Sequence, residues 1–573
     1  MIALCSHLKF LNMNPVDPLS WLDAPRNDRG VEFFDDDTLS AERCSYQEIA
    51  TAATRIAGGL IEAGVTKGSP VPVLCRTSVD MITAFYGVQA AGCVVSVIAP
   101  PTAISGDDHR DHIRAVVTAL AADVLVIDAQ HLDYASTVLC EAERRVRLLP
   151  LEQLAEACPA RRAPDQRALV QFTSGSSGKP RGVVISNAAL AANTAAIRTW
   201  EQAGPDDVWC SWLPMHHGMG LIGCLVVPVS GNNDLSVCTP ETFIRDPRPY
   251  LRRLDGRQVA HPATITAMPA FGLQNIVDKT PPEDLQGANF SQIRAVIVGG
   301  EHIDPKVLRR FTELLAPHGL DRRALTPAYG LTESTLAVTG VPIDQAPTSV
   351  LVKRSDLRVG ATISPVTQQA HEGDTDLVEM ISCGRPLQGI SVCVTDDDGQ
   401  PVSEGNVGEL VVRGTSLSDG YLGATNATFD GDALHTHDAA FEIDGELFVL
   451  GRYCDSVNVF AQPVFAEEVE LLLTRADLPA DRVCAVLGEH DAQPYAYAVL
   501  EDLDDHAAKR AAEVLARACP GTRSKVVRLP RGAIPRTTSG KSKRHLLWHH
   551  LIEGDPLVAS AARTGRHHQQ EER

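Results

Sequence analysis

Short apolar runs alternate with stretches of helical spacing through most of the chain. Residues 71–75 (Val-Pro-Val-Leu-Cys) form such a run, and residues 77–91 follow with apolar side chains at helical intervals. Because short apolar segments separated by helices are typical of buried parallel strands, this pattern predicts an α/β fold with parallel or mixed sheets. Further runs of the same kind occupy residues 93–98, 124–127, 168–172 and 295–298.

The pattern changes near Gly384. Beyond it, β-rich segments follow one another with only turn sequences between them, such as Asp-Asp-Gly-Gln at 397–400. These β-rich segments are residues 390–396, 408–412 and 446–450. We therefore expect a large N-terminal domain with a β-rich subdomain over residues 1–451, a small α+β domain over 452–563, and a disordered polar tail at 564–573.

The chain contains 573 residues, of which 44% are hydrophobic and 22% are charged, and its formal net charge is −20. This length implies more than one domain, and the hydrophobic fraction excludes a disordered or collagen-like protein. The acidic excess argues against non-specific binding to nucleic acid or to an anionic membrane surface. A local basic patch for phosphate groups is still compatible with it.

The 14 cysteines are scattered singly, without a C-x-x-C pair, which argues against a zinc ribbon or a thioredoxin-like motif. The first 25 residues lack the basic and apolar segments of a secretory signal. No stretch approaches the roughly 18 consecutive apolar residues of a transmembrane helix. We therefore expect a cytoplasmic protein with reduced thiols and no transmembrane segment.

A loop rich in glycine and hydroxyl residues follows one of the apolar runs. The segment 171–184 reads Gln-Phe-Thr-Ser-Gly-Ser-Ser-Gly-Lys-Pro-Arg-Gly-Val-Val. Closely spaced glycines and hydroxyls leave many N–H and O–H donors free for a polyphosphate. The segment is not a Walker A loop, because Pro180 follows Lys179 where that loop needs Ser or Thr. Taken alone, such a cluster could equally be a flexible surface turn.

Three further motifs follow along the chain. Residues 329–334 read Tyr-Gly-Leu-Thr-Glu-Ser, Asp438 precedes the pair Gly451-Arg452, and residues 535–541 read Pro-Arg-Thr-Thr-Ser-Gly-Lys. In this order and at this spacing, the motifs resemble those of the adenylate-forming superfamily, which includes acyl-CoA synthetases, peptide-synthetase adenylation domains and luciferases. The resemblance covers nearly the whole chain, and it implies a mobile C-terminal domain that closes over the site.

Two features resemble one branch of that superfamily, the fatty acyl-AMP ligases. Residues 211–221 (Ser-Trp-Leu-Pro-Met-His-His-Gly-Met-Gly-Leu) are similar to the signature S-W-L-P-x-x-H-D-M-G-L of this branch. The segment 341–380 is longer than in most relatives, and residues 350–360 within it resemble the extra segment that accompanies poor use of coenzyme A. An insertion of this length could also be a loop without functional meaning.

The resemblance implies that ATP, together with Mg²⁺, activates a fatty acid. The carboxylate would attack the α-phosphate, pyrophosphate would leave, and the acyl-adenylate would pass to the phosphopantetheine arm of an acyl carrier protein of a polyketide or peptide synthase. Two alternatives stay open. One is a fatty acid–coenzyme A ligase of the same fold, and the other is a non-catalytic homologue that binds ATP or acyl chains.

By the same resemblance, each motif has a role in this reaction. The phosphate-binding residues would be Thr173, Ser174, Gly175, Ser176, Ser177, Gly178 and Arg181. The other nucleotide-binding residues would be Gly300, Glu301, Tyr329 at the adenine, Asp438 at the ribose, and Arg452. Thr332 would contact the α-phosphate, Glu333 would hold Mg²⁺, and Lys541 would bridge the carboxylate and the α-phosphate. The residues of the acyl pocket would be His217, Met219, Pro269 and Phe271.

Four positions depart from the family pattern. Gly218 stands in place of the acidic residue of the 211–221 signature, and His437 replaces the glycine of a T-G-D motif. Cys454 occupies the hinge position, where Asp or Lys is usual, and Ala461 replaces the first glycine of a loop that serves the second step. None of these changes removes a group needed for adenylation, but together they predict a slow or specialised transfer step.

Overall fold

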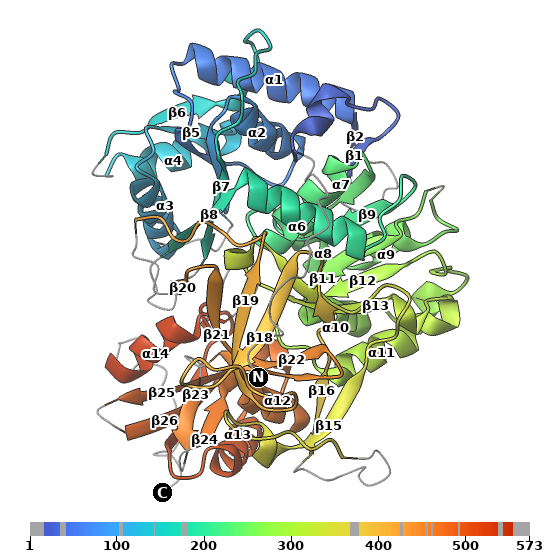
Figure 1. The fold of residues 1–573 in the computed structure, drawn as a ribbon, viewed down its shortest axis with the longest axis vertical. Helices are drawn as coiled ribbons and strands as arrows, with labels where there is room; N and C mark the ends of the chain where they lie inside the picture. The colour runs from blue at the N-terminus through green and yellow to red at the C-terminus, as the bar shows by residue number, and fades with distance from the viewer. Residues whose placement is uncertain are drawn as a thin grey trace, which may run out of the picture.

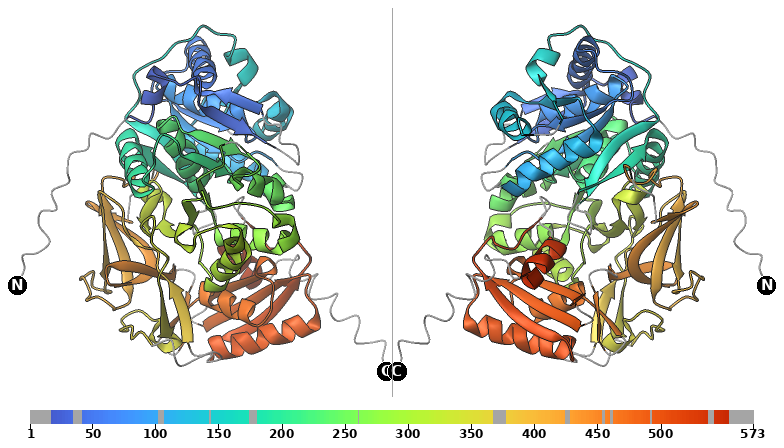
Figure 2. Two further views of the ribbon diagram at one scale, coloured as in Figure 1. Left: turned by 90° about the vertical axis from the view of Figure 1, so that its right-hand side faces the viewer. Right: turned by 90° about the vertical axis from the view of Figure 1, so that its left-hand side faces the viewer.

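The computed structural model describes residues 17–34, 42–101, 107–141, 144–173, 180–259, 261–366, 377–423, 428–452, 456–459, 462–490, 493–536 and 542–553. Its elements stack along the long axis of the molecule (Figure 1). A first α/β region lies at one end and a second lies in the middle. The β-rich region and the C-terminal region lie side by side at the other end, as Figure 2 shows.

The first region is built on a six-stranded sheet in the order β6-β5-β3-β4-β7-β8. The strands from β6 to β7 pair in parallel, and β8 returns antiparallel to β7. Val71 and Val73 of β3 are completely buried, as expected for a parallel sheet that helices cover. The strands are β3 (Pro70–Leu74), β4 (Val94–Ile98), β5 (Val124–Ile127), β6 (Arg147–Pro150), β7 (Arg167–Thr173) and β8 (Arg181–Ser186). The helices are α1 (Tyr46–Glu62), α2 (Val79–Ala90), α3 (Asp107–Leu120), α4 (Leu132–Leu139) and α5 (Leu151–Leu154).

The second region holds a nine-stranded sheet in the order β17-β14-β13-β12-β11-β9-β10-β1-β2. The central strands from β13 to β1 are parallel, whereas β2, β14 and β17 pair antiparallel at the two edges. The strands are β1 (Gly30–Phe33), β2 (Glu42–Ser45), β9 (Val208–Ser211), β10 (Asp234–Val237), β11 (Ile265–Met268), β12 (Ala295–Val298), β13 (Leu325–Gly330), β14 (Ala337–Gly340) and β17 (Arg385–Pro386). The helices are α6 (Asn187–Trp200), α7 (Val227–Ser230), α8 (Pro240–Arg245), α9 (Arg248–Leu254), α10 (Ala270–Lys279) and α11 (Pro305–Leu315).

A buried asparagine fastens helix α6 to the antiparallel edge of this sheet. Asn193 Nδ2 donates to Ala337 O at 2.8 Å, and Asn193 Oδ1 accepts from Ala337 N at 3.1 Å. The side chain of Asn193 is completely buried, so both bonds are shielded from water. Strand β14 thus keeps its place beside β13, which carries one of the predicted site motifs.

The β-rich region is a five-stranded sheet in the order β18-β19-β21-β20, in which β22 also pairs with β21. The hairpin between β21 and β22 turns at Asp444 and Gly445, which both have positive φ, as a two-residue hairpin turn requires. The strands are β18 (Ile390–Thr395), β19 (Gly408–Gly414), β20 (Phe429–Asp430), β21 (Ala433–Ile443) and β22 (Glu446–Arg452).

The long segment at 341–380 contributes an antiparallel pair of strands, β15 (Ser349–Lys353) and β16 (Leu377–Ile381). Apolar residues of this pair, such as Val352 and Met380, share one core with Phe441 of β21 and with Phe465 and Leu471 of the C-terminal region. The described part of the insertion therefore packs against both neighbouring regions.

The C-terminal region is α+β. Its three-stranded sheet has the order β25-β26-β27, antiparallel between the first two strands and parallel between the last two. Residues such as Val469, Ala498 and Leu515 form a core within this region. Its elements are β23 (Ser456–Val459), β24 (Gln462–Phe465), α12 (Ala466–Arg475), β25 (Val483–His490), β26 (Gln493–Glu501), α13 (Asp505–Ala518), β27 (Arg523–Leu529) and α14 (Arg544–Glu553).

The predicted fold class is confirmed. The apolar runs correspond to β3, β4, β5, β7 and β12, the helical stretch at 77–91 contains α2, and the β-rich segments correspond to β18, β19 and β22. No helix within the described part of the chain has the length and apolar character needed to cross a membrane. The tail at 564–573 lies outside the described residues.

Candidate active site

Several of the predicted nucleotide-binding residues lie on four elements, β7, β8, β13 and β21. Thr173 ends β7, Arg181 begins β8, Tyr329 lies near the end of β13, and Asp438 lies in β21. The segment 418–422 connects β8 with the motif that follows β13, because its backbone pairs with β8 and Ser418 N donates to Glu333 O at 2.9 Å. Ligand sites of α/β sheets form at the carboxyl ends of strands, and β7 and β13 contribute their ends in this way.

The two strands that flank the predicted phosphate loop are held together at their tips. Thr173 lies opposite Arg181, and Thr173 Oγ1 donates to Arg181 O at 3.5 Å. The loop between them contains predicted residues that lie outside the described part of the chain, namely Ser174, Gly175, Ser176, Ser177 and Gly178. Their proposed contacts with phosphate stay predictions.

Arg181 stacks on an aromatic ring that the sequence did not single out. Its guanidinium carbon lies 3.6 Å from the ring centroid of Tyr421, and the hydroxyl of Tyr421 donates to Glu333 Oε1 at 2.6 Å. Burial and the Glu333 carboxylate raise the pKa of Tyr421, so the phenol stays protonated and keeps donating. Tyr421 therefore links the predicted phosphate-binding arginine to the predicted magnesium ligand.

The motif that carries Thr332 and Glu333 ends in a strained turn. These residues form a short 3-10 helix, η7 (Thr332–Ser334), and Thr335 follows with φ +67 and ψ −63. Leu336 N donates to Ser334 O at 2.8 Å, so Thr335 is the centre of a γ-turn with positive φ, a rare and strained form. Thr335 is fully buried and its Oγ1 donates to Ser416 O at 2.7 Å, which holds the strained residue in place.

Tyr329 and Arg452 both contact the carboxylate of Asp438. The hydroxyl of Tyr329 donates to Asp438 Oδ2 at 2.5 Å, and Arg452 Nε lies 3.5 Å from Asp438 Oδ1. Burial, together with the Asp438 charge, raises the pKa of Tyr329 well above its usual value, so the tyrosine acts as a donor. The buried carboxylate is therefore oriented by two side chains from two other strands.

Three of the predicted acyl-pocket residues, Met219, Pro269 and Phe271, lie next to the turn that follows β12. Met219 begins a π-helix, η3 (Met219–Val226), a rare conformation that is often found at functional sites. A Cβ atom placed on Gly300, whose φ is +83, would lie 3.6 Å from Met219 Cε. Glu301 Oε1 accepts from Phe271 N at 2.6 Å, near the start of α10, which follows directly on Pro269. The structure thus brings Met219, Gly300, Glu301 and Phe271 together.

His217 lies just before the π-helix, and its ring centroid is 4.8 Å from that of His216. The substituted Gly218 faces an apolar side chain, because a Cβ atom there would lie 3.5 Å from Leu336 Cδ1. An acidic side chain at this position would meet that apolar group. Two other departures, Cys454 and Ala461, lie outside the described residues.

Lys541 also lies outside the described residues, but its flanks are placed. Arg536 pairs with Ser542, and Lys543 N donates to Pro535 O at 2.7 Å. Burial lowers the pKa of His112 of α3 to about 4, and the charges of His109 and Lys543 add to this effect. Lys543, two residues after Lys541, therefore lies close enough to α3 of the first region for its charge to act on His112.

The donor set at Glu333 suits a metal ion that arrives with a nucleotide. Within the described ranges, no group of three or more His, Cys, Asp or Glu side chains could hold a metal by itself. Mg²⁺ in phosphate-transfer sites commonly takes one or two carboxylates, substrate phosphate oxygens and water. Glu333, with one oxygen bonded to Tyr421, fits the role of such a single carboxylate ligand.

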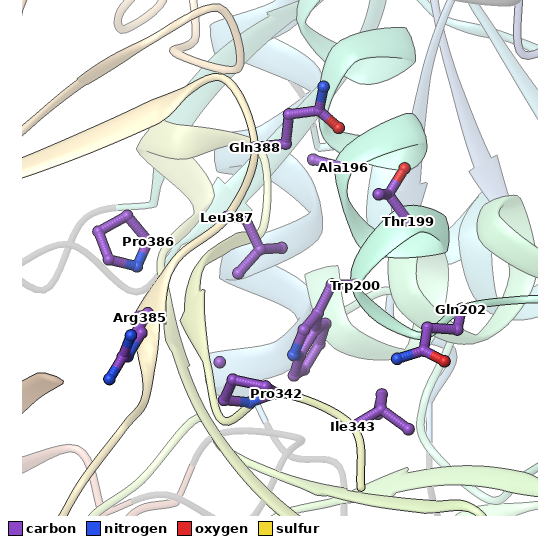
Figure 3. A pocket seen from close by; sticks show the side chains of 11 residues that line it. Ala196, Thr199, Trp200, Gln202, Pro342, Ile343, Arg385, Pro386, Leu387 and Gln388 are labelled. Carbon is purple, nitrogen blue, oxygen red and sulfur yellow. The ribbon is translucent and has the colours of Figure 1, made fainter. Parts of the chain in front are cut away.

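A separate pocket of about 230 Å³ lies between the end of α6 and the β14–β17 edge. Figure 3 shows Trp200 of α6 standing among Pro342, Ile343 and Leu387 in this pocket. None of the predicted site residues lines it. We assign no part of the reaction to this pocket.

Comparisons with known proteins place the chain in a family. The family of AMP-binding enzymes matches residues 25–422. A candidate acyl-CoA synthetase of Caulobacter vibrioides is 28% identical over 537 residues, which cover 91% of this chain and 92% of the relative. A long-chain-fatty-acid–AMP ligase of Mycobacterium marinum is 28% identical over 563 residues, which cover 90% of this chain and 93% of the relative.

The fold is shared with solved structures. One, from a study of fatty acyl-adenylate ligases of E. coli and L. pneumophila, superposes with a TM-score of 0.83 at 23% identity. The match covers 94% of this chain and 97% of the other. The chain therefore belongs to the family of AMP-binding enzymes, which confirms its assignment to the adenylate-forming ligases.

Proposed function

We propose that this protein uses ATP to convert a fatty acid into an acyl-adenylate and pyrophosphate. The observation that carries the proposal is the meeting of two oriented carboxylates at one site. Asp438 accepts from Tyr329 and lies near Arg452, and Glu333 accepts from the tyrosine on which Arg181 stacks. A carboxylate can accept from both hydroxyls of a ribose, and a second carboxylate can hold the cation of a nucleotide.

In the reaction, an oxygen of the fatty acid carboxylate bonds to the α-phosphorus, and the bond from that phosphorus to the leaving pyrophosphate oxygen breaks. Thr332 would contact the α-phosphate, and Lys541 would lie between the attacking carboxylate and the phosphate, so that its positive charge offsets the charge that builds there. The loop from Thr173 to Gly178 would bind the departing pyrophosphate. When bound by Glu333 and phosphate oxygens, Mg²⁺ would neutralise part of the phosphate charge.

Tyr329 would position the adenine, and its hydroxyl would keep its hydrogen bond to Asp438. Gly300 and Glu301 would line the same crevice. The acyl chain would lie beyond that turn, against Met219, Pro269 and Phe271, with His217 at the wall of the pocket. The name of the Mycobacterium marinum relative supports a long-chain fatty acid as the substrate class.

We further propose that the acyl group passes to the phosphopantetheine arm of an acyl carrier protein. The resemblance of residues 350–360 to the extra segment that accompanies poor use of coenzyme A supports this choice. Through Val352 and Met380, the insertion also shares a core with Phe465 and Leu471 of the C-terminal region. A rotation of that region would expose this apolar surface, so the transfer step would carry a cost with either acceptor. A fatty acid–coenzyme A ligase is the second candidate, which the name of the Caulobacter vibrioides relative favours.

The first step is tested with purified protein, ATP, Mg²⁺ and a series of fatty acids of increasing chain length. We expect release of pyrophosphate and an acyl-AMP product of matching mass by mass spectrometry. Lys541→Ala should abolish pyrophosphate release, whereas Lys525→Ala, at an exposed position of β27, serves as the matched control. Wild-type protein that releases no pyrophosphate with any acid would contradict the proposal and favour a non-catalytic homologue.

The second step is tested by offering coenzyme A and a carrier protein with its phosphopantetheine arm in parallel reactions. We expect acyl-carrier-protein as the main product. A fast and complete conversion to acyl-coenzyme A would instead identify the protein as a coenzyme A ligase.

A further inference from the structure

A local widening of the β-rich sheet lies directly before Asp438. In the pairing of β19 with β21, Glu409 faces Ala439 and Val411 faces His435. The residues of β21 between His435 and Ala439 therefore lie opposite a single residue of β19, Leu410. Such bulges bend a strand and redirect a side chain, and they are common beside active sites. Here the redirected side chain is that of Asp438.

The bulge contains a histidine in a backbone conformation that favours glycine. His437 has φ +57, in the left-handed region that residues with a Cβ atom rarely adopt. In the family motif that this segment resembles, glycine stands here, and glycine adopts this conformation without steric cost. The conformation expected of the glycine is therefore retained, although the residue is not.

One carboxylate supports this strained position from the neighbouring strand. Glu409 Oε1 accepts from His437 N at 3.1 Å and lies 3.0 Å from His437 Nδ1. Its other oxygen, Oε2, lies 3.2 Å from His435 Nδ1. Thr436 completes the turn, since its Oγ1 donates to Leu410 O at 2.7 Å and accepts from Asp438 N at 3.1 Å.

The support that Glu409 gives to this turn depends on whether His437 is protonated. Burial opposes ionisation of Glu409, but the hydrogen bonds from His437 and His435 outweigh it and lower the pKa of Glu409 to about 2. The bond to Glu409 raises the pKa of His437, Asp438 raises it further, and Arg181 of β8 acts in the opposite direction. The ion pair is therefore complete when His437 is protonated.

We propose that Glu409 and His437 form a positioning pair that holds the left-handed turn and thereby directs the Asp438 carboxylate toward the nucleotide. Neither residue needs to contact ATP for this role. The inference rests on the proposed function only in assigning Asp438 to the ribose. It also explains how the chain tolerates a histidine where the family pattern has glycine.

The pair is tested by a double-mutant cycle on the full-length protein, with ATP and Mg²⁺ binding measured by calorimetry. Glu409→Gln removes the charge that holds His437, so we expect ATP affinity to fall about tenfold, because the strained turn then loses its support. In the His437→Gly background the same Glu409→Gln change should weaken binding less than about twofold, because glycine adopts the turn without support. Glu404→Gln, an exposed carboxylate of the same region, is the matched control.

Further measurements separate positioning from general stability. The midpoint of thermal unfolding identifies variants that are merely unfolded. The KM for the fatty acid should stay constant in Glu409→Gln while the KM for ATP rises, and this rise should be larger at pH 6 than at pH 8. An equal loss of ATP affinity in both backgrounds, an unchanged affinity in Glu409→Gln, or no ATP binding by the wild type would each overturn the inference. Wild-type protein that binds ATP but releases no pyrophosphate would contradict only the proposed function.

Discussion

Replacing Tyr421 with phenylalanine tests the link between the two charged groups that it joins. The change removes only the hydroxyl that donates to Glu333 Oε1 at 2.6 Å, and it keeps the ring 3.6 Å below the Arg181 guanidinium. A hydrogen bond to a charged group contributes about 1.5–3 kcal/mol. Because Tyr421 is only half-buried, the lower end applies. That value corresponds to a roughly tenfold change in an equilibrium or rate.

The assay is pyrophosphate release with saturating fatty acid, at several concentrations of ATP and Mg²⁺. We expect kcat/KM for ATP to fall about tenfold in Tyr421→Phe, because Glu333 loses the donor that orients it. The Mg²⁺ concentration needed for half-maximal rate should rise. Tyr421→Leu should reduce the rate further, since Arg181 then loses a cation–π contact of about 0.5–2 kcal/mol.

Tyr495→Phe is the matched control, because its hydroxyl accepts from Arg523 at 3.0 Å within the C-terminal region, away from the candidate site. An unaltered Mg²⁺ requirement and kcat/KM in Tyr421→Phe would refute the reasoning. So would a loss of activity that parallels a lower unfolding midpoint, because the effect would then be one of stability alone.

Three further predictions concern the supports of the site. Thr335→Val removes the buried hydrogen bond to Ser416 O at 2.7 Å, and it should lower the free energy of unfolding in denaturant by about 1–3 kcal/mol, whereas Thr335→Ser should lower it less. Asn193→Ala removes the side chain that bonds the backbone N–H and C=O of Ala337, and the same titration should show a free energy of unfolding lower by about 2–4 kcal/mol. A decrease smaller than that of an exposed Asn→Ala change would contradict this prediction. The Glu409–His437 pair should stabilise the fold most between pH 4.5 and pH 6.5, the ordinary pKa values of a glutamate and a histidine in an unfolded chain. Its contribution should vanish as the pH falls through about 2, where Glu409 is protonated, and as the pH rises through the raised pKa of His437. A wild-type minus Glu409→Gln difference in unfolding free energy that stays constant from about pH 5.5 to about pH 9 would contradict this assignment.

The elements of the fold could be predicted where one local pattern determines them. Each apolar run in the first half became a strand, because a short apolar segment can be buried on both faces of a parallel sheet. The turn at 397–400 was equally readable, since it contains a glycine, and Gly399 indeed has positive φ. Family motifs also indicated, from the sequence alone, that Tyr329, Glu333 and Asp438 belong to one site.

The contacts between distant segments could not be predicted in this way. Tyr421 bonds Glu333 only because residues 418–422 pair with β8, and no local pattern in that segment specifies a partner so far away. In the sequence, nothing distinguishes Glu409 from the other residues of the predicted β-segment 408–412. Its importance became visible only through the backbone conformation of His437, which depends on the register between β19 and β21.

The pairing of residues 418–422 with β8 also affects how the protein is made. Val184 N donates to Gly420 O and Leu422 N donates to Gly182 O, each at 2.8 Å, so this late segment covers the outer edge of the strand next to the phosphate loop. A nascent chain on the ribosome cannot complete that edge until residue 422 has emerged. Shorter fragments would present an open strand edge, which invites aggregation. Split or truncated forms of this protein should therefore keep everything up to residue 422 on one polypeptide.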